Sequence, residues 1–301
     1  MALPRIYTDE NAARERLEAL LWPDGPICPH CGSIDSATRL KGKSTRAGLL
    51  KCRECEKPFS VTVKTVFERS KVPLNSWVYA THLLTSSKKG ISSHQLSRML
   101  GVTYKTAWFM THRIREAMRP AEMTPMGGAG GTVEIDETFT GRLEGQQFNP
   151  RGGWAHKNVV LTLVERGGVA RSFKIDSTNI ANIVPIIRKN VRRESVLMTD
   201  EANWYRGVGR EYANHLSVNH KERVYSVGEI TTNTVEGYFS IFKRGMRGIY
   251  QHCSEKHLHR YLSEFDFRYN NRIALGVDDA VRADKALKGI KDKRLTYRQP
   301  H

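Results

Sequence analysis

Three carboxylate residues stand in settings that suit the binding of divalent metal ions. Asp136 lies in the apolar run TVEIDETF, Asp200 ends the run SVLMTD, and Glu236 lies in the stretch NTVEGYFSIFKRGM. The first two runs have the character of strands, and the third has that of a helix. Hard cations such as Mg²⁺ take oxygen ligands and are usually held by a few carboxylates together with substrate phosphates. If the three side chains converge, the sequence predicts metal-dependent chemistry on a phosphodiester.

Each of these carboxylates also has an ordinary explanation. Asp200 suits the cap of a following helix, and Glu236 suits an exposed helix position. Other acids, namely Glu134, Glu137 and Glu201, lie one or two positions away from the two aspartates. Successive side chains of a strand point to opposite faces, so Glu137 and the aspartate before it are not expected to face the same site. We therefore assign the site to the first three carboxylates and rank their neighbours second.

Two pairs of cysteines have the spacing of a zinc-binding ribbon. Cys28-Pro-His-Cys31 and Cys52-Arg-Glu-Cys55 are C-x2-C knuckles separated by residues 32–51. Thiolates at this spacing hold one tetrahedral Zn²⁺ ion. Because four protein ligands leave no open position, the predicted zinc is structural. The fifth cysteine is predicted to be a packed free thiol.

Two helices joined by a glycine are predicted between the ribbon and the acids. Ser92 or Ser93 can cap the first helix, Gly101 can make the turn, and Thr103 can cap the second. This order resembles a helix-turn-helix, whose second helix enters the major groove of DNA by its N-terminal end. An ordinary helical hairpin is the alternative. The residues expected to contact DNA here are Tyr104, Lys105, Thr106 and Arg113.

The charge of the chain favours a polyanionic partner. Lys and Arg number 48 against 31 Asp and Glu, which gives a net charge of +17. Neutralising phosphates with such residues releases counterions, so nucleic acid is the expected partner. Three cations that follow the third acid, Lys243, Arg244 and Arg247, are expected to meet phosphates, although a solvated helix face would explain them too. No apolar run is long enough for a membrane span and the N-terminal residues lack a signal-peptide core, so a cytoplasmic protein is expected.

Changes in composition divide the chain into five predicted segments. The glycine-rich run MGGAGG cannot sustain a helix and is taken as a linker. After it, strand and helix patterns alternate in a mixed α/β layout with helices packed on a sheet. The predicted segments are 1–70 (helix capped by Thr8, then zinc ribbon), 71–125 (helix-turn-helix), 126–131 (linker), 132–275 (catalytic domain) and 276–301 (basic tail).

Three stretches of the chain resemble one family of transposases. They are VEIDETFTG around Asp136, VLMTDEANWY around Asp200, and TTNTVEGYFSIFKRGMRGIYQHCSEKHLHRYLSEFDFRYNNR around Glu236. Together with the ribbon and the helix pair, they resemble the zinc-ribbon group of DDE transposases from bacterial insertion sequences, called ISXO-like. The resemblance covers most of residues 15–272. One departure is that many relatives carry His where this chain has Thr231 or Thr232.

The resemblance implies an RNase H-like catalytic domain with helices on both faces of a mixed sheet. It implies that Asp136, Asp200 and Glu236 hold two Mg²⁺ or Mn²⁺ ions. It also implies double-stranded DNA partners, both terminal inverted repeats and target DNA, and a homo-oligomer of at least two subunits. The expected activity is cleavage at the ends of the element and transfer of the 3′-OH ends in the bacterial cytoplasm, at the nucleoid. The alternatives are a non-catalytic regulator derived from a transposase and a metal-dependent nuclease.

Overall fold

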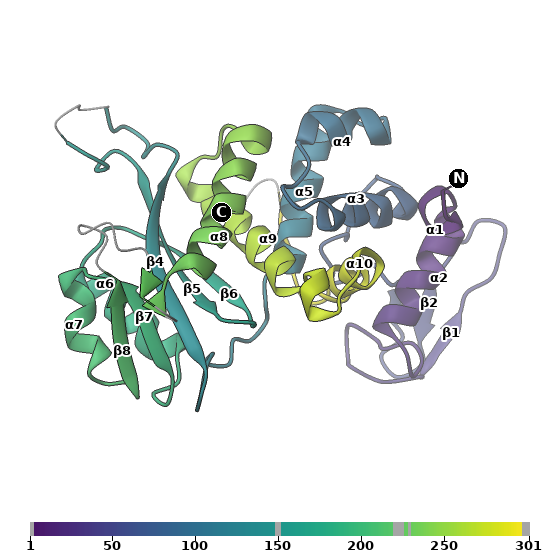
Figure 1. The fold of residues 1–301 in the computed structure, drawn as a ribbon. Coiled ribbons are helices and arrows are strands. Elements are labelled where there is room, and N and C mark those ends of the chain that lie inside the picture. The colour runs from purple at the N-terminus through teal and green to yellow at the C-terminus, as the bar shows by residue number, and fades with distance from the viewer. Residues whose placement is uncertain (1–2, 148–151, 219–225, 228–229, 297–301) are drawn as a thin grey trace. The chain divides into compact units, whose positions relative to one another are not determined.

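The chain divides into two units, shown in Figure 1. The computed structural model describes residues 3–147, 152–218, 226–227 and 230–296. The ribbon unit comprises Met1–Arg119 together with Val277–His301, and the sheet unit comprises Pro120–Gly276. None of the helices in the described ranges combines the length and apolarity that a bilayer span requires.

A five-stranded mixed sheet forms the centre of the sheet unit. Its order is β6-β5-β4-β7-β8. The first three strands of that order pair antiparallel, whereas β7 runs parallel to both β4 and β8. A second, two-stranded sheet pairs β9 with β10. The strands are β4 (Thr132–Thr140), β5 (Asn158–Glu165), β6 (Ala170–Ile175), β7 (Val196–Asp200), β8 (Asn214–Val218), β9 (Ser226–Val227) and β10 (Ile230–Thr231).

Helices cover both faces of the five-stranded sheet (Figure 1). Val133 and Ile135 of β4 pack with α6 and α7, whereas Val160 and Val164 of β5 pack with α8 and α9. Strands buried on both faces read as continuous apolar runs, which explains the sequence NVVLTLVE of β5. The helical elements of this unit are α6 (Ile180–Asn190), α7 (Asn203–Gly209), α8 (Asn233–Gly245), a π-helical segment (Met246–Tyr250), 3₁₀ turns (Glu255–His257 and Ile273–Leu275) and α9 (Leu258–Asn270).

A buried polar cluster fixes α8 and α9 against β6. Asp266 of α9 accepts hydrogen bonds from the Tyr238 hydroxyl of α8 at 2.6 Å and from the backbone N–H of Ser172 in β6 at 2.8 Å. Burial raises the pKa of Asp266 to about 6. Because buried polar groups are costly unless paired, this cluster fixes the position of α8 against the sheet.

The glycine-rich residues 126–131 are packed, in contrast to the linker expected from composition. Met126 is 3% exposed and its N–H donates to the Asn190 carbonyl at 2.8 Å. Gly127 has φ +77°, and a Cβ there would lie 2.2 Å from the Ser195 Oγ. Glycine is therefore required here for close packing, and the boundary between the units falls earlier, at Pro120.

Short elements at the N-terminus build the ribbon. Strands β1 (Ala37–Arg39), β2 (Leu50–Cys52) and β3 (Pro58–Phe59) pair antiparallel in that order. The predicted first helix is split in two, α1 (Arg5–Thr8) and α2 (Glu10–Leu21). The cap of α2 is Asp9, whose side chain accepts from the Ala12 N–H at 2.7 Å, so the sequence-based assignment of Thr8 as the cap was one residue off.

Three further helices in the ribbon unit include the predicted pair. They are α3 (Leu74–Ser86), α4 (Ser93–Leu100) and α5 (Tyr104–Met118). Ser92 caps α4 and Thr103 caps α5, each by accepting a backbone N–H three residues later. Gly101 ends α4 in the left-handed region at φ +65°. The helix-glycine-helix arrangement read from the sequence is therefore present.

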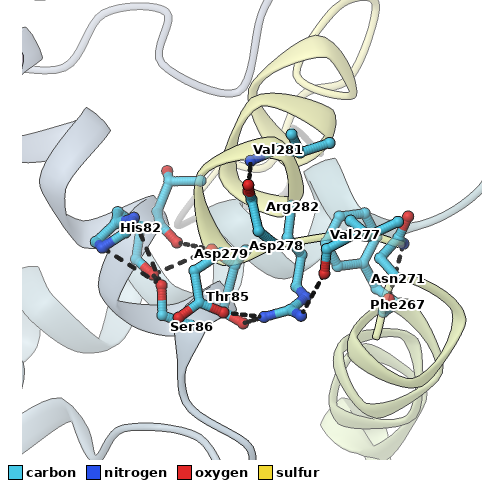
Figure 2. A network of polar contacts seen from close by, with 11 residues as sticks. His82, Thr85, Ser86, Phe267, Asn271, Val277, Asp278, Asp279, Val281 and Arg282 are labelled. Carbon is cyan, nitrogen blue, oxygen red and sulfur yellow. Dashed lines mark hydrogen bonds and ion pairs between the residues drawn. The ribbon is translucent and has the colours of Figure 1, made fainter. Parts of the chain in front are cut away.

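The C-terminal segment forms a helix, α10 (Asp279–Lys288), where the sequence predicted a basic tail. This helix contacts α2, α3 and α5 of the ribbon unit. Figure 2 shows Arg282, 6% exposed, donating to the carbonyls of Thr85 at the end of α3 and of Val277. A guanidinium at a helix C-terminus satisfies orphan carbonyls and favours the helix dipole. The tail prediction missed this because the partner of α10 lies about two hundred residues away in the sequence.

Candidate active site and zinc centre

Two neighbouring strands bring the predicted aspartates together. Strand β4 pairs in parallel with β7 from Thr132 opposite Val196, and continuing that register sets Asp136 level with Asp200. Carboxylate oxygens of Asp136, Glu137 and Asp200 all lie within 4.8 Å of one another. Parallel pairing therefore brings two acids that are distant in sequence into one cluster at the end of β7.

Glu137 belongs to this cluster, which corrects the expectation that it would face away. It lies on the α7 side of the sheet, where its Oε1 accepts from Trp204 Nε1 at 2.9 Å and from the Tyr205 hydroxyl at 2.6 Å. Strand β7 ends at Asp200, whereas β4 continues to Thr140. Beyond that point the β7 edge of β4 is open, so side chains from both faces can meet around it. Asp136 and Glu137 therefore still alternate along β4, whose pairing with β5 is regular at both positions, and it is only their carboxylates that meet.

The cluster disfavours its own negative charge. Burial, together with the charges of Glu137, Asp200 and Glu236, raises the pKa of Asp136 to about 7. Burial also raises the pKa of Glu137 to about 7, with Asp200 adding to the effect and the Tyr205 and Trp204 hydrogen bonds opposing it. Like charges held close in a partly buried site cannot all ionise without a compensating cation.

The donor set fits a divalent cation. The clustered groups are hard carboxylate oxygens, the ligands that Mg²⁺ and Mn²⁺ prefer. A cation among them would offset the repulsion that raises the two pKa values. The oxygens converge near the end of β7. Among the described residues, their hydrogen bonds come from backbone N–H groups, Trp204 and Tyr205, and none comes from a basic side chain. The arrangement therefore suits metal binding better than a set of ion pairs.

Glu236 does not join the compact cluster, in contrast to the sequence-based expectation. It lies in the first turn of α8, is exposed, and its Oε1 accepts from the Thr232 hydroxyl at 3.2 Å. Its charge is nevertheless close enough to contribute to the raised pKa of Asp136. The structure thus places Glu236 beside the cluster, with its carboxylate turned back toward the start of its own helix.

Glu134 ties α8 to the strand that carries Asp136. It is fully buried, and its carboxylate accepts the backbone N–H groups of Thr234 at 2.8 Å and Val235 at 2.9 Å. The Thr234 hydroxyl donates to the same carboxylate at 2.8 Å. A carboxylate is favoured at a helix N-terminus because it satisfies orphan N–H groups and complements the helix dipole. Glu134 therefore fixes the first turn of α8, including Glu236.

Arg166 strengthens the contact between Glu134 and the start of α8. Its Nε donates to Glu134 Oε1 at 2.7 Å, and its Nη2 donates to the Thr231 carbonyl at 2.8 Å, just before α8. Sequence reasoning noticed Glu134 only as a competitor for the site. The available signal was the spacing of two residues between Glu134 and Asp136, which places both side chains on one face of a strand.

The four predicted zinc ligands converge in the ribbon. The Sγ atoms of Cys28 and Cys55 are 3.7 Å apart, as are those of Cys31 and Cys52, and all four lie within 4.8 Å of one another. A tetrahedral ZnS₄ site with Zn–S bonds of about 2.3 Å has sulfur–sulfur edges of roughly 3.8 Å. The cysteines form no disulfide, so the donor set and its spacing fit one structural zinc ion.

The predicted DNA-contacting residues of α5 lie at its exposed start. Tyr104 is 47% exposed and stacks on His94 of α4, with ring centroids 4.2 Å apart. Lys105 is exposed, and Thr106 sits in the capping turn. Arg113 differs: it is half-buried, lies over the Phe109 ring at 4.9 Å, and donates to the Leu295 carbonyl at 3.2 Å. Arg113 thus packs within the ribbon unit, and its contact with DNA stays a prediction.

The three predicted cations of the sheet unit lie along the end of α8. Arg244 donates to the Ser240 carbonyl and hydroxyl on its own helix. Lys243 lies over the Phe239 ring at 5.8 Å, and Arg247 is exposed in the π-helical segment. Lys243 and Arg247 also line one cavity, whereas Arg244 does not. Lys243 and Arg247 therefore share a cavity, whereas Arg244 is bonded to its own helix.

Family comparisons agree with both centres. The sequence model of the ISXO2-like transposase domain matches residues 128–270, and that of the transposase zinc-ribbon domain matches residues 8–58. The chain belongs to the ISXO2-like transposase family. The first match contains the acidic cluster, and the second contains all four clustered cysteines.

A relative of this ISXO2-like chain is an uncharacterized protein in the transposable element ISH50 of Halobacterium salinarum. It is 26% identical over 282 residues, which cover 88% of this chain and 92% of the relative. Among solved structures, a chain of the simian T-cell lymphotropic virus intasome in complex with PP2A regulatory subunit B56 gamma aligns with 12% identity and a TM-score of 0.29. That alignment covers 57% of this chain and 63% of the other, and at such a score it carries no argument.

Proposed function

We propose that this chain is an active transposase that cleaves DNA at the ends of an insertion sequence and transfers the 3′-OH ends to target DNA. The observation that carries the proposal is the cluster of Asp136 and Glu137 in β4 with Asp200 at the end of the parallel strand β7, inside the domain that matches the family. The sheet order β6-β5-β4-β7-β8, with three antiparallel strands followed by two parallel ones, supports an RNase H-like catalytic domain.

Asp136, Asp200 and Glu236 are the proposed ligands of two Mg²⁺ or Mn²⁺ ions. When bound, such ions activate water for attack and stabilise the departing 3′ oxygen in an in-line displacement. Asp136, with its raised pKa, would release a proton when the site is filled. Glu236 would be free to hold an ion once its Oε1 no longer accepts from the Thr232 hydroxyl, while Glu134 holds its helix in place. Glu137, held by Trp204 and Tyr205, remains the alternative third ligand.

The ribbon unit is the proposed reader of the terminal repeats. We propose that α4 and α5 form a helix-turn-helix, with Tyr104, Lys105 and Thr106 presented to the major groove. The exposure of Tyr104 and the capped start of α5 support this orientation. The net charge of +17 favours the DNA backbone as a partner. Since an element has two ends and target DNA must join both, the proposed active form is a homo-oligomer of at least two subunits on DNA.

A cleavage and strand-transfer assay on DNA that carries the element's ends tests the proposal. Mg²⁺ should support cutting and joining, and its removal should stop both. Asp136→Ala, Asp200→Ala and Glu236→Ala should each abolish cleavage and keep DNA binding, whereas Glu137→Gln should retain cleavage. Loss of activity in Glu137→Gln with retention in Glu236→Ala would move the third ligand to Glu137. Cutting without joining would indicate a nuclease, and DNA binding without metal-dependent cutting would indicate a regulator.

A further inference from the structure

A cavity of about 180 Å³ lies in the sheet unit where β4 ends. Its wall includes Thr140 of β4, Asn158 of β5 and the cations Lys157, Lys243 and Arg247. Within the part of the chain that the structure describes, no carboxylate pairs with these three cations; Lys157 lies 4.1 Å from the Trp154 ring centroid, and Lys243 lies over Phe239. A small cavity with three uncompensated positive charges is suited to an anionic ligand.

Asn158 adds a hydrogen-bonding requirement to this cavity. It is only 2% exposed, and its Oδ1 has no hydrogen-bond partner among the described residues. Its Nδ2 donates to the Arg142 carbonyl at 3.4 Å, an arrangement that sets which end of the amide is the acceptor. Buried acceptors are normally satisfied, so an unpaired one in the wall of a cavity points to a ligand that brings a donor.

The cavity is aligned with the acidic cluster. Thr234 at the start of α8 bonds to Glu134, and Lys243 near its end shares the cavity with Thr140, so α8 runs in the same direction as β4. Lys243 follows Glu236 by two helical turns, roughly 10 Å along the helix. Thr140 lies four residues beyond the cluster aspartate on the same strand face, roughly 14 Å away. For a DNA strand that follows β4 and α8 away from the cluster, this distance corresponds to three or four nucleotides at about 3.4 Å each along the duplex axis.

We propose that this cavity binds one unpaired nucleotide of the DNA strand, three or four positions from the cleavage site. The cations contact its phosphate, and a ring N–H or amino group of its base donates to Asn158 Oδ1. A base inside the duplex cannot reach an amide that is 2% exposed, so the nucleotide must leave the stack. The proposal rests on the transposase function, since it takes the acidic cluster as the point of cleavage.

Cys253 provides a direct test because it lines the same cavity and forms no disulfide. The full-length, zinc-loaded Asp136→Asn protein is incubated with duplexes of the element's end that carry a disulfide-tethered base at successive positions from the cleavage site. Cross-linking is expected to peak at the third or fourth position and to disappear in the Cys253→Ser variant. Asn158→Ala should lower that peak at least fivefold, whereas Lys189→Gln, which removes an exposed charge from α6, should not. Cross-links spread evenly along the DNA would overturn the proposal.

A second arm separates nucleotide recognition from phosphate contact alone. The tether is moved to the phosphate, and the base at the peak position is removed. The abasic duplex should cross-link at least fivefold less, and an equal yield would show that no base is bound. If Asn158→Ala fails to fold, the Lys243→Gln/Arg247→Gln double variant takes its place. Because the cross-link needs no cleavage, its outcome is independent of whether the wild-type protein cuts and joins DNA with Mg²⁺.

Discussion

Asp136 and Glu137 occupy positions in which burial and mutual repulsion oppose their ionisation. Both have pKa values raised to about 7, from ordinary values of 3.8 and 4.5. An acidic cluster of this kind is unfavourable to the fold until a cation binds, so metal binding and the stability of the metal-free fold oppose each other at these residues. Burial also raises the pKa of Asp266 to about 6, so ionisation of Asp266 likewise lowers the stability of the fold.

The stability of the metal-free sheet unit should therefore fall as pH rises. Between about pH 4 and pH 7 the folded chain holds protons that the unfolded chain has released, so unfolding becomes easier as pH rises through this window. We expect a loss on the order of 3 kcal/mol between pH 5 and pH 8, measured by urea unfolding without Mg²⁺ or Mn²⁺. Adding Mg²⁺ at pH 8 should restore stability.

The control for this pH dependence is Asp136→Asn, which cannot ionise at that position. It should be more stable than wild type at pH 8, bind Mg²⁺ weakly and show a flatter pH profile. A wild-type free energy of unfolding that rises from pH 5 to pH 8 would contradict the assigned origin of the raised pKa values.

Zinc removal should act on the ribbon unit alone. Cys28→Ser or Cys52→Ser takes one sulfur from a site whose binding energy contributes to folding, so the ribbon should lose its ordered structure. Metal analysis should show zinc falling from one ion per chain to near zero. Cys253→Ser is the matched control, because Cys253 lies outside the cluster and should leave zinc content unchanged. Zinc retained in both ligand variants would rule out the four-cysteine site.

At the scale of elements, the position of α8 decides whether Glu236 can serve the site. The anchor is Glu134, which accepts two backbone N–H groups at the start of α8 and pairs with Arg166. A buried charge of this kind is costly unless fully paired, and here its partners belong to the helix and to the turn before it. Strand β4 thus carries Asp136 and the anchor for Glu236 two residues apart on one face.

Glu134→Gln should weaken catalysis more than it weakens folding. The amide can accept one helix N–H but loses the charge that pairs with Arg166, and a stability loss of about 1–3 kcal/mol is expected. Because the first turn of α8 is then less fixed, half-saturation by Mg²⁺ should shift upward by tenfold or more. Exposed Glu194→Gln is the control. A variant with lower activity but an unchanged Mg²⁺ dependence would indicate a purely structural role for Glu134.

Local sequence patterns predicted the helices, strands and cysteine pairs. The contacts between residues far apart in the chain could not be predicted from such patterns. The cysteine knuckles, the Ser92 and Thr103 caps and the strands that carry the two aspartates depend on nearby residues, and each was found. The role of Glu134 depends on a helix one hundred residues later. The meeting of Glu137 with Asp200 depends on where a neighbouring strand stops, which no periodicity records.

At the scale of the whole molecule, the ribbon unit is built from both ends of the chain. Helix α10 contacts α2, α3 and α5, and its Arg282 satisfies carbonyls at the end of α3. The sheet unit is therefore inserted within the ribbon unit in sequence, and each unit keeps its own apolar core. Units with separate cores are expected to unfold in separate transitions.

Ending the chain after Gly276 should destabilise the ribbon unit and leave the sheet unit folded. The loss of α10 uncovers apolar surface of α3 and leaves the Thr85 carbonyl without its guanidinium donor. Limited proteolysis should then cut within residues 3–119 and spare 120–276. In the full chain, Arg282→Ala should produce a milder form of the same effect, whereas Val281→Ala, on the exposed side of α10, should not. Equal protease resistance of truncated and full chains would contradict the role of α10.

The return of the last helix to the first unit also sets an order of events during synthesis. The sheet unit, with its acidic cluster, is complete once Gly276 has emerged from the ribosome, while the ribbon unit still awaits α10. A nascent or prematurely ended chain therefore has the cluster without a finished ribbon unit. If that unit reads the DNA ends, a chain that stops before α10 carries the acidic cluster but lacks a finished reader to direct it.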